Sequence, residues 1–295
     1  MGEWHPESPA RLRAIEDQLI RARLDGLFER REAPLAEIPA ILRNHSAAAL
    51  ALVRDNTPTH EGELYPLDGD TMLCAHSYQA ALRAAGAALA ATDAVIAGGI
   101  ANAFCATRPP GHHARPSEPM GFCLFNNVAI AARHALDSHG LARVAIIDFD
   151  VHHGNGTAEA FRDDPRVLMA SFFQHPFYPY TEPEPRSPTR VNIPVPAGSG
   201  GDVVRALVTE HWLPALHAFL PEMLFISAGF DAHREDDIGN MGLVEDDYAW
   251  ITTQLMGLAK EHCRGRIVSC LEGGYNLSAL GRSVVAHLKA LAEIA

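Results

Sequence analysis

Short apolar runs that end in polar residues recur along this chain. Residues 144–147 are apolar throughout, as is typical of a strand buried on both faces, and the residues that follow include two aspartates and two histidines. Three further segments are built in the same way, at 103–113, 223–231 and 266–275. In open parallel α/β sheets ligands bind at the carboxyl ends of the strands, so we expect these four endings to meet in one crevice.

The end of the strand at 144–147 carries residues that suit a metal site. Asp150 and His152 lie on the same side of an extended backbone, so both can reach one divalent cation. Asp231 ends the segment 223–231 and offers a third ligand. Two carboxylates and one imidazole leave a coordination position open, which is typical of catalytic zinc. A lone Asp-x-His is more often a polar strand exit with satisfied histidines, but the agreement among four segments favours a metal site.

Two other segments supply groups for acid–base chemistry. His112 and His113 follow a proline-glycine turn and could deprotonate a water molecule on the metal. Tyr275 follows two glycines, and its hydroxyl could hold an oxyanion opposite the metal. Together these groups suit the hydrolysis of an acyl bond.

These motifs resemble those of the zinc-dependent histone deacetylase and acetylpolyamine amidohydrolase superfamily, and are closest to its class II and bacterial members. Four motifs carry the resemblance: RPPGHHARPSEPMGFCLFNN, DFDVHHGNG, SAGFDAHREDDIGNMG and LEGGYNL. It extends from HPESPARLRAI at residues 5–15 to the last predicted helix, and so covers nearly the whole chain. It implies a single-domain α/β fold over residues 1–295, similar to arginase and the deacetylases, with a mainly parallel central sheet and helices on both faces.

The resemblance implies a role for each residue of the predicted metal site. Zinc would be bound by Asp150, His152 and Asp231, and Tyr275 would polarise the acyl carbonyl. A potassium ion would lie beside the zinc. Its expected ligands are Asp148, Asp150 and His152 with Ser171 and Phe172 from the next strand, partly through backbone carbonyls.

The resemblance also implies different roles for the two histidines. His113 would be the general base and then the general acid, while His112 would act mainly electrostatically. The residues that orient them would be Asp148 for His112 and Asn155 for His113. A neutral amide stabilises an imidazolium less than a carboxylate does. We therefore expect His113 to be less basic than in members with aspartate at that position.

Gly121, Phe122 and Tyr178 match the narrow substrate channel of the family, whose aromatic walls would clasp the alkyl chain of an acylated lysine or polyamine. Ordinary core packing is the alternative for the two aromatics. Ile238 stands seven residues after Asp231, where polyamine-selective vertebrate members carry an acidic residue. Ile238 therefore gives no selectivity for a cationic tail.

Three features near the ends and loops of the domain carry further expectations. The domain usually begins with a short strand before the HPE motif, and this chain starts four residues upstream of His5, so we expect that outer strand to be absent. Arg11 matches an arginine that lines an internal exit route in the family, although a solvent-facing helix arginine fits equally well. The proline-rich stretch at 176–196 is expected to be an ordered loop.

Composition excludes some classes of function but does not identify one. The formal net charge of −12 excludes a broad basic surface for nucleic acid and would favour cationic substrates. The alanine-rich helix from residue 77 is interrupted by polar residues before about 20 apolar residues accumulate, so we expect no membrane span. Five cysteines show neither metal spacing nor a disulfide framework, which suits a reducing, cytoplasmic location. Whether copies of the chain associate stays open.

The sequence thus predicts a zinc-dependent amidohydrolase that removes an acyl group, most simply acetyl, from an amine such as acetyl-lysine or an acetylated polyamine. Two alternatives stay open. One is a manganese ureohydrolase, since arginase shares the fold, but that chemistry needs further carboxylates to bridge a second metal. The other is a non-catalytic module that binds acyl-lysine, against which the intact tyrosine and histidine pair argue.

Overall fold

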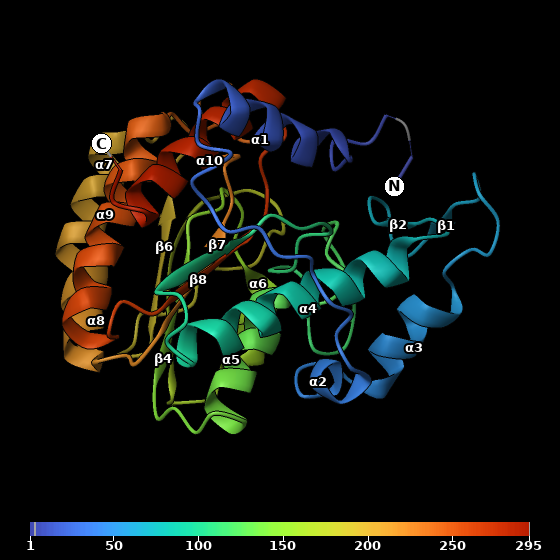
Figure 1. Ribbon diagram of the computed structural model, residues 1–295, viewed down its shortest axis with the longest axis horizontal. Coiled ribbons are helices and arrows are strands. Elements are labelled where there is room, and N and C mark those ends of the chain that lie inside the picture. The colour runs from blue at the N-terminus through green and yellow to red at the C-terminus, as the bar shows by residue number, and fades with distance from the viewer. Residues whose placement is uncertain (3, 295) are drawn as a thin grey trace.

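A parallel sheet with helices on both faces forms the centre of the molecule (Figure 1). The computed structural model describes residues 1–2 and 4–294. Within these residues the main sheet has six strands in the order β3-β8-β7-β4-β5-β6, all paired in parallel. They are β3(Asn102–Cys105), β4(Val144–Asp148), β5(Val167–Gln174), β6(Arg190–Val195), β7(Leu224–Ala228) and β8(Ile267–Leu271). A small antiparallel hairpin lies apart from them, formed by β1(Tyr65–Pro66) and β2(Met72–Leu73).

The helices form a layer on each side of the sheet. On one side lie α1(Ala10–Arg21), α7(Gly201–Leu207), α8(Leu213–Phe219), α9(Glu245–His262) and α10(Leu277–Leu291), with the π-helical turn η1(Val208–Trp212) joining α7 to α8 (Figure 1). On the other lie α4(Ser77–Ile96) and α5(Asn127–Asp137). The short helices α2(Ile38–Leu42) and α3(Ala47–Asp55) pack beyond α4 and α5, and α6(Asn155–Ala160) follows the loop after β4.

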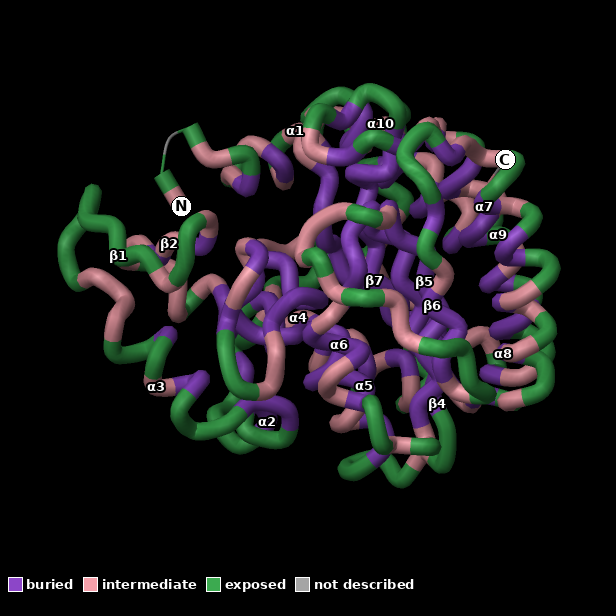
Figure 2. Tube along the Cα trace, turned by 180° about the vertical axis from the view of Figure 1, so that it is seen from behind, coloured by how far each residue is buried: buried purple, intermediate pink, exposed green. Residues whose placement is uncertain are grey.

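The central strands are apolar throughout because both of their faces are covered. In β4, Ala145 and Ile147 join the core beneath α7 to α10, while Val144 and Ile146 join the core beneath α4 and α5. This alternation is what an extended strand imposes on a buried apolar run. Figure 2 shows the same arrangement, with buried residues on the strands and exposed ones on the outer helices and loops.

The structure corrects the expectation of a loop at 176–196. Residues 190–195 form β6, which pairs with β5 along the edge of the sheet. Proline lacks the N–H that a strand donates to its neighbours. Pro194 therefore led us to expect a loop where the structure has a strand. An edge strand tolerates proline because one of its sides has no partner strand.

Two expectations near the N-terminus can now be compared with the structure. Arg11 is fully buried, so the reading of it as a solvent-facing helix arginine is wrong. Among the described residues no strand precedes α1, and β3 forms that edge of the sheet.

As expected, none of the helices described is both long and apolar enough to cross a bilayer.

Candidate active site

The carboxyl ends of β4, β7 and β8 bring the predicted site residues together. These strands are neighbours in the sheet, in the order β8-β7-β4. Asp148 is the last residue of β4, Asp231 comes three residues after β7 ends, and Tyr275 comes four residues after β8 ends. The loop after β3 adds His112 and His113. The four segments therefore meet as the apolar pattern predicted.

Three predicted metal donors converge in the interior. Nδ1 of His152 lies 2.9 Å from Oδ1 of Asp150 and 3.2 Å from Oδ2 of Asp231. All three side chains are buried, and one donor atom from each lies within 4.8 Å of the others. Two carboxylates and one imidazole form a mixed oxygen and nitrogen set that suits zinc.

The hydrogen bonds around these donors leave one oxygen free. Oδ1 of Asp231 accepts the backbone N–H of Val151 at 2.9 Å, and Oδ2 of Asp150 accepts that of Gly273 at 2.8 Å. Oδ2 of Asp231 is buried and makes no hydrogen bond among the described residues, and its contact with Nδ1 of His152 at 3.2 Å is with another of the three donors. Burial and the nearby charge of Asp150 raise the pKa of Asp231 to about 7. A buried carboxylate oxygen without a hydrogen bond is costly, so a cation fits this donor set.

Glycines line the other side of the same donors. A Cβ on Gly273 would lie 2.0 Å from Oδ2 of Asp231, and a Cβ on Gly229 would lie 2.1 Å from Oδ2 of Asp150. Real Cβ atoms do not approach other atoms so closely. Both positions therefore require glycine for the carboxylates to keep their places.

The tandem histidines lie beside the metal donors and have different partners. Nδ1 of His112 lies 3.0 Å from Oδ2 of Asp148, and Nδ1 of His113 lies 2.7 Å from Oδ1 of Asn155. Burial lowers the pKa of His112, but the charges of Asp150 and Asp148 outweigh it and the net pKa is raised well above the usual value. Burial, followed by the charges of His112 and His152, lowers the pKa of His113 well below the usual value.

Tyr275 is half-buried between a cation and an aromatic ring. The guanidinium carbon of Arg11 lies 4.9 Å from the centroid of the Tyr275 ring, and the Phe122 ring lies edge-on at 5.9 Å. Burial raises the pKa of Tyr275 well above its usual range, although the charge of Arg11 acts in the opposite direction. The Tyr275 hydroxyl is therefore protonated at neutral pH and can donate a hydrogen bond.

Two of the predicted channel residues, Tyr178 and Gly121, lie against His113. The Tyr178 ring stands edge-on to His113 with centroids 5.2 Å apart. Gly121 has a φ of 57°, and a Cβ there would lie 2.5 Å from Cδ2 of His113, so this close approach requires glycine. Ile238 is half-buried on the loop after Asp231. Phe177, whose ring stacks on His152 with centroids 5.3 Å apart, was not predicted from the sequence.

The residues expected around potassium lie on β4 and β5. Asp148 and Ser171 are register partners in this parallel pair, and both are buried. Oγ of Ser171 lies 3.0 Å from Oδ1 of Asn192 and donates to it. The Phe172 ring stacks on Trp212 in the core, so the polar group that this residue offers is its backbone carbonyl.

Glu272 is a buried carboxylate that the sequence analysis did not single out. Its Oε2 accepts the backbone N–H groups of Gly111 at 2.6 Å and His112 at 3.1 Å, and its Oε1 accepts the Ser227 hydroxyl at 3.2 Å. Burial raises the pKa of Glu272 to about 7. This carboxylate therefore holds the backbone of the tandem histidines, and its position in LEGGY beside Tyr275 was the only signal for it.

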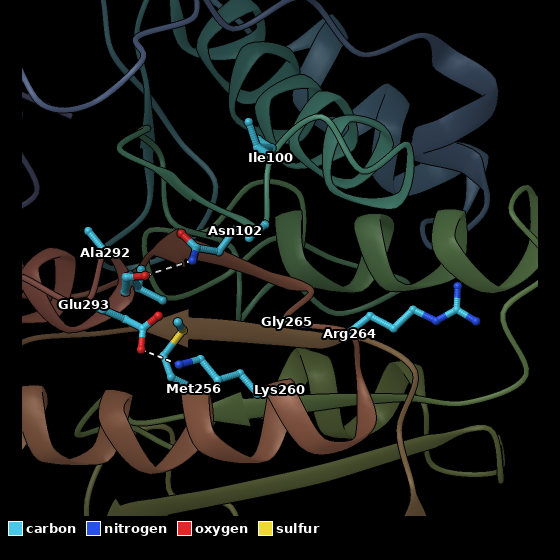
Figure 3. A pocket seen from close by; sticks show the side chains of 10 residues that line it. Ile100, Asn102, Met256, Lys260, Arg264, Gly265, Ala292 and Glu293 are labelled. Carbon is cyan, nitrogen blue, oxygen red and sulfur yellow. Dashed lines mark hydrogen bonds and ion pairs between the residues drawn. The ribbon is translucent and has the colours of Figure 1, made fainter.

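An open pocket of about 580 Å³ lies elsewhere, between the start of β3 and the ends of α9 and α10 (Figure 3). Asn102, Met256, Lys260 and Glu293 are among its lining residues. Its lining contains no histidine, aspartate or cysteine, and it opens at the amino edge of the sheet. The chemistry of the catalytic edge therefore does not extend to this pocket.

Comparison with known proteins agrees with this geometry. The model of the histone deacetylase domain matches residues 5–291. The chain belongs to the histone deacetylase family. It is 39% identical over 309 residues to Histone deacetylase 14, chloroplastic, of Arabidopsis thaliana, covering 98% of this chain and 73% of that protein. It is 37% identical over 281 residues to the Histone deacetylase-like amidohydrolase of Pseudomonas aeruginosa, covering 92% of this chain and 73% of the relative.

The fold of this deacetylase family member is also found in a solved structure. The crystal structure of the HDA15 HD domain aligns with a TM-score of 0.89 at 33% identity, over 99% of this chain and 86% of that one. The predicted arginase- and deacetylase-like architecture is thereby confirmed. Relatives named as deacetylases and amidohydrolases support a hydrolase activity.

Proposed function

We propose that this protein is a zinc-dependent deacylase that hydrolyses the amide of an acylated amine, such as acetyl-lysine or an acetylated polyamine. One observation carries the proposal. The buried Oδ2 of Asp231, which makes no hydrogen bond, faces the donors of Asp150 and His152, within the same cluster of strand ends that holds the histidine pair and Tyr275. The family match supports the reaction class.

The residues that would hold the metal are Asp150, His152 and Asp231. When bound there, zinc supplies Lewis-acid polarisation of the acyl carbonyl and acidifies water. The proposed potassium site, with Asp148, Ser171 and the carbonyl of Phe172, would neutralise the remaining buried carboxylate charge next to it.

The hydrogen bonds of the histidine pair support their proposed roles. The Asn155 oxygen only accepts, so Nδ1 of His113 carries the proton and Nε2 keeps a free lone pair. His113, neutral because its pKa is lowered, can take a proton from water at Nε2 and later pass it to the leaving amine. His112 donates from Nδ1 to Asp148 and stays cationic, so it stabilises negative charge nearby.

Tyr275 would complete the site on the opposite side of the acyl carbon. Its protonated hydroxyl can donate to the oxygen on which negative charge develops as water attacks. The rings of Phe122 and Tyr178 would exclude water from the acyl chain and line its approach to the site.

Metal analysis together with an acyl-amide panel tests the proposal. We expect about one catalytic zinc per chain, loss of turnover on chelation and recovery with Zn²⁺, with acetyl-lysine amides among the substrates ranked by kcat/KM. Asp231→Ala should lose both zinc and turnover while the fold is kept. Two manganese ions per chain would instead establish a ureohydrolase. A zinc-loaded protein that binds acyl-lysine without turnover would establish a binding module.

A further inference from the structure

Two helices end side by side at the edge of the sheet opposite the catalytic groups. α8 precedes β7 and α9 precedes β8, so both helix ends lie at the amino edge of the strands (Figure 1). His217 lies in the last turn of α8, and Glu261 and His262 are the last two residues of α9. No role in the proposed reaction falls to these three side chains.

The polar atoms of this cluster point toward one another. Nδ1 of His217 lies 2.8 Å from Nε2 of His262. Glu261 places Oε1 3.4 Å from Nε2 of His262 and Oε2 3.9 Å from Nδ1 of His217. His262 is only 14% exposed, whereas His217 and Glu261 are 44% and 61% exposed and accessible from solvent.

Two imidazole nitrogens and a carboxylate are a donor set for a divalent transition ion, with water filling the remaining position. Donor atoms bound to one tetrahedral zinc at about 2.0–2.1 Å stand roughly 3.3 Å apart. The distance from His262 to Glu261 already matches this separation. The two imidazole nitrogens share a hydrogen bond, so on binding its proton moves to the other nitrogen of the same ring and the two nitrogens part by about half an ångström. The His217 side chain is 44% exposed, so it can make that movement toward solvent.

The local backbone favours a cation at the same point. The carbonyl groups at the end of a helix give it a partial negative charge, and here two such ends meet. Lys260, the nearest preceding cation on α9, is paired with Glu293 on the side of the pocket in Figure 3. Its charge is therefore already matched.

A second surface cluster with the same donor types provides a comparison. His134 and His139 both place Nε2 on Oδ1 of Asp93, at 2.7 and 2.6 Å. Nη1 of Arg43 lies 3.0 Å from Nδ1 of His134 and can only donate, so Nε2 of His134 must carry a proton. A metal there would have to displace that proton beside a guanidinium charge. The side chains at Asp93 therefore satisfy one another by hydrogen bonds and do not favour a metal ion.

We infer that His217, Glu261 and His262 form a second site for a divalent transition ion such as Zn²⁺, remote from the catalytic centre. Because two of the ligands, His217 and Glu261, are exposed and the two imidazoles must separate to bind, the ion should exchange more readily than one held by the buried donors at the carboxyl edge.

Calorimetric titration of the purified, zinc-loaded protein with Zn²⁺ tests this inference, with zinc per chain measured before and after. We expect one further equivalent to bind. It should be lost in His217→Ala and His262→Ala and weakened in Glu261→Gln, while turnover is unchanged in all three. His139→Ala, from the comparison cluster, should bind the further equivalent as the parent does.

Two results would overturn the inference: no further equivalent in the parent protein, or a further equivalent that persists in the His217→Ala and His262→Ala double variant. Loss of the equivalent in His139→Ala would assign the ion to the other cluster and would also overturn it. If the catalytic edge held no zinc, the parent would bind one ion and His217→Ala none. That pattern would support this site and refute the proposed reaction, so the two failures can be told apart.

Discussion

The carboxylate of Asp236 accepts the backbone N–H of Tyr275 at 2.6 Å. The same oxygen accepts the N–H of Asn276 at 2.9 Å, and the other oxygen accepts that of Ile238. Asp236 lies on the loop that begins with Asp231. One loop therefore carries a proposed zinc ligand and also fixes the backbone of the proposed oxyanion donor.

Removing this carboxylate should impair turnover without removing zinc. Asp236→Ala leaves two N–H groups at Tyr275 and Asn276 without their acceptor, and a misplacement of about 1 Å can cost on the order of 10² in rate. We expect kcat to fall by roughly that factor, with zinc content kept. Asp237→Ala, at the exposed neighbouring position, is the matched control and should keep its kcat. An unchanged kcat in Asp236→Ala would mean that another contact places Tyr275.

The hydroxyl of Tyr275 should matter for turnover and not for metal binding. Loss of one preorganised oxyanion donor typically costs about 10² to 10³ in kcat, so Tyr275→Phe should lose that much while its zinc content is unchanged. Because the ring and the channel survive, the variant should still bind a hydroxamate chelator in a displacement assay. Retention of more than about a tenth of the kcat would exclude the hydroxyl as the electrophilic partner.

Gly273 should be intolerant of even a methyl group. The added Cβ of Gly273→Ala would lie 2.0 Å from Oδ2 of Asp231 and 2.6 Å from Oδ2 of Asp150, so the two carboxylates must move apart. We expect zinc content and kcat/KM to fall together while circular dichroism is preserved. Gly257→Ala on α9 is the control, because its Cβ meets nothing within 4 Å and should stabilise the helix by about 0.5–1 kcal/mol. A fully zinc-loaded Gly273→Ala protein would contradict the proposed ligand positions.

His45 should make folding stability depend on pH. Its Nδ1–H donates to the Arg115 carbonyl at 3.0 Å, and its Nε2 accepts the Asn126 N–H at 2.9 Å, so the ring is held neutral. Burial lowers the pKa of His45 from 6.5 to about 4. Between these values only the unfolded chain binds the proton. Stability is therefore complete above pH 6.5 and falls as the pH drops toward 4, by about 2 kcal/mol at pH 5.

Urea unfolding at pH 7.5 and pH 5 measures this effect. His45→Gln cannot take up the proton, so it should lose less stability between the two pH values than the parent does, by up to about 2 kcal/mol. If the free energy of unfolding fell equally in both proteins between pH 7.5 and pH 5, groups other than His45 would carry the pH dependence.

The sequence predicted the strands that define the catalytic edge because they are buried on both faces. An apolar run that ends in aspartate or histidine is visible wherever it occurs, as at β4 and β7. β6 was missed because a strand that contains proline is tolerated only at the edge of a sheet. The residues of a strand do not by themselves show whether it lies at the edge.

The supporting groups of the site were harder to predict for a related reason. Glu272 and Asp236 act through backbone N–H groups of segments far away in the chain, and Arg11 is buried by contacts of the same kind. Its guanidinium donates to the carbonyls of Gly274 and Glu272 and bonds Glu7. Local sequence pattern carries no information about such long-range partners.

The proline of β6 has a consequence for the outer edge of the sheet. The carbonyl of Val195 faces β5, where it accepts the N–H of His175 at 2.9 Å, so the neighbouring Pro194 faces outward. Pro194 is exposed and has no N–H to offer a further strand. A strand from another chain would lose a ladder hydrogen bond at this point, and the open edge is thereby protected against edge-to-edge aggregation.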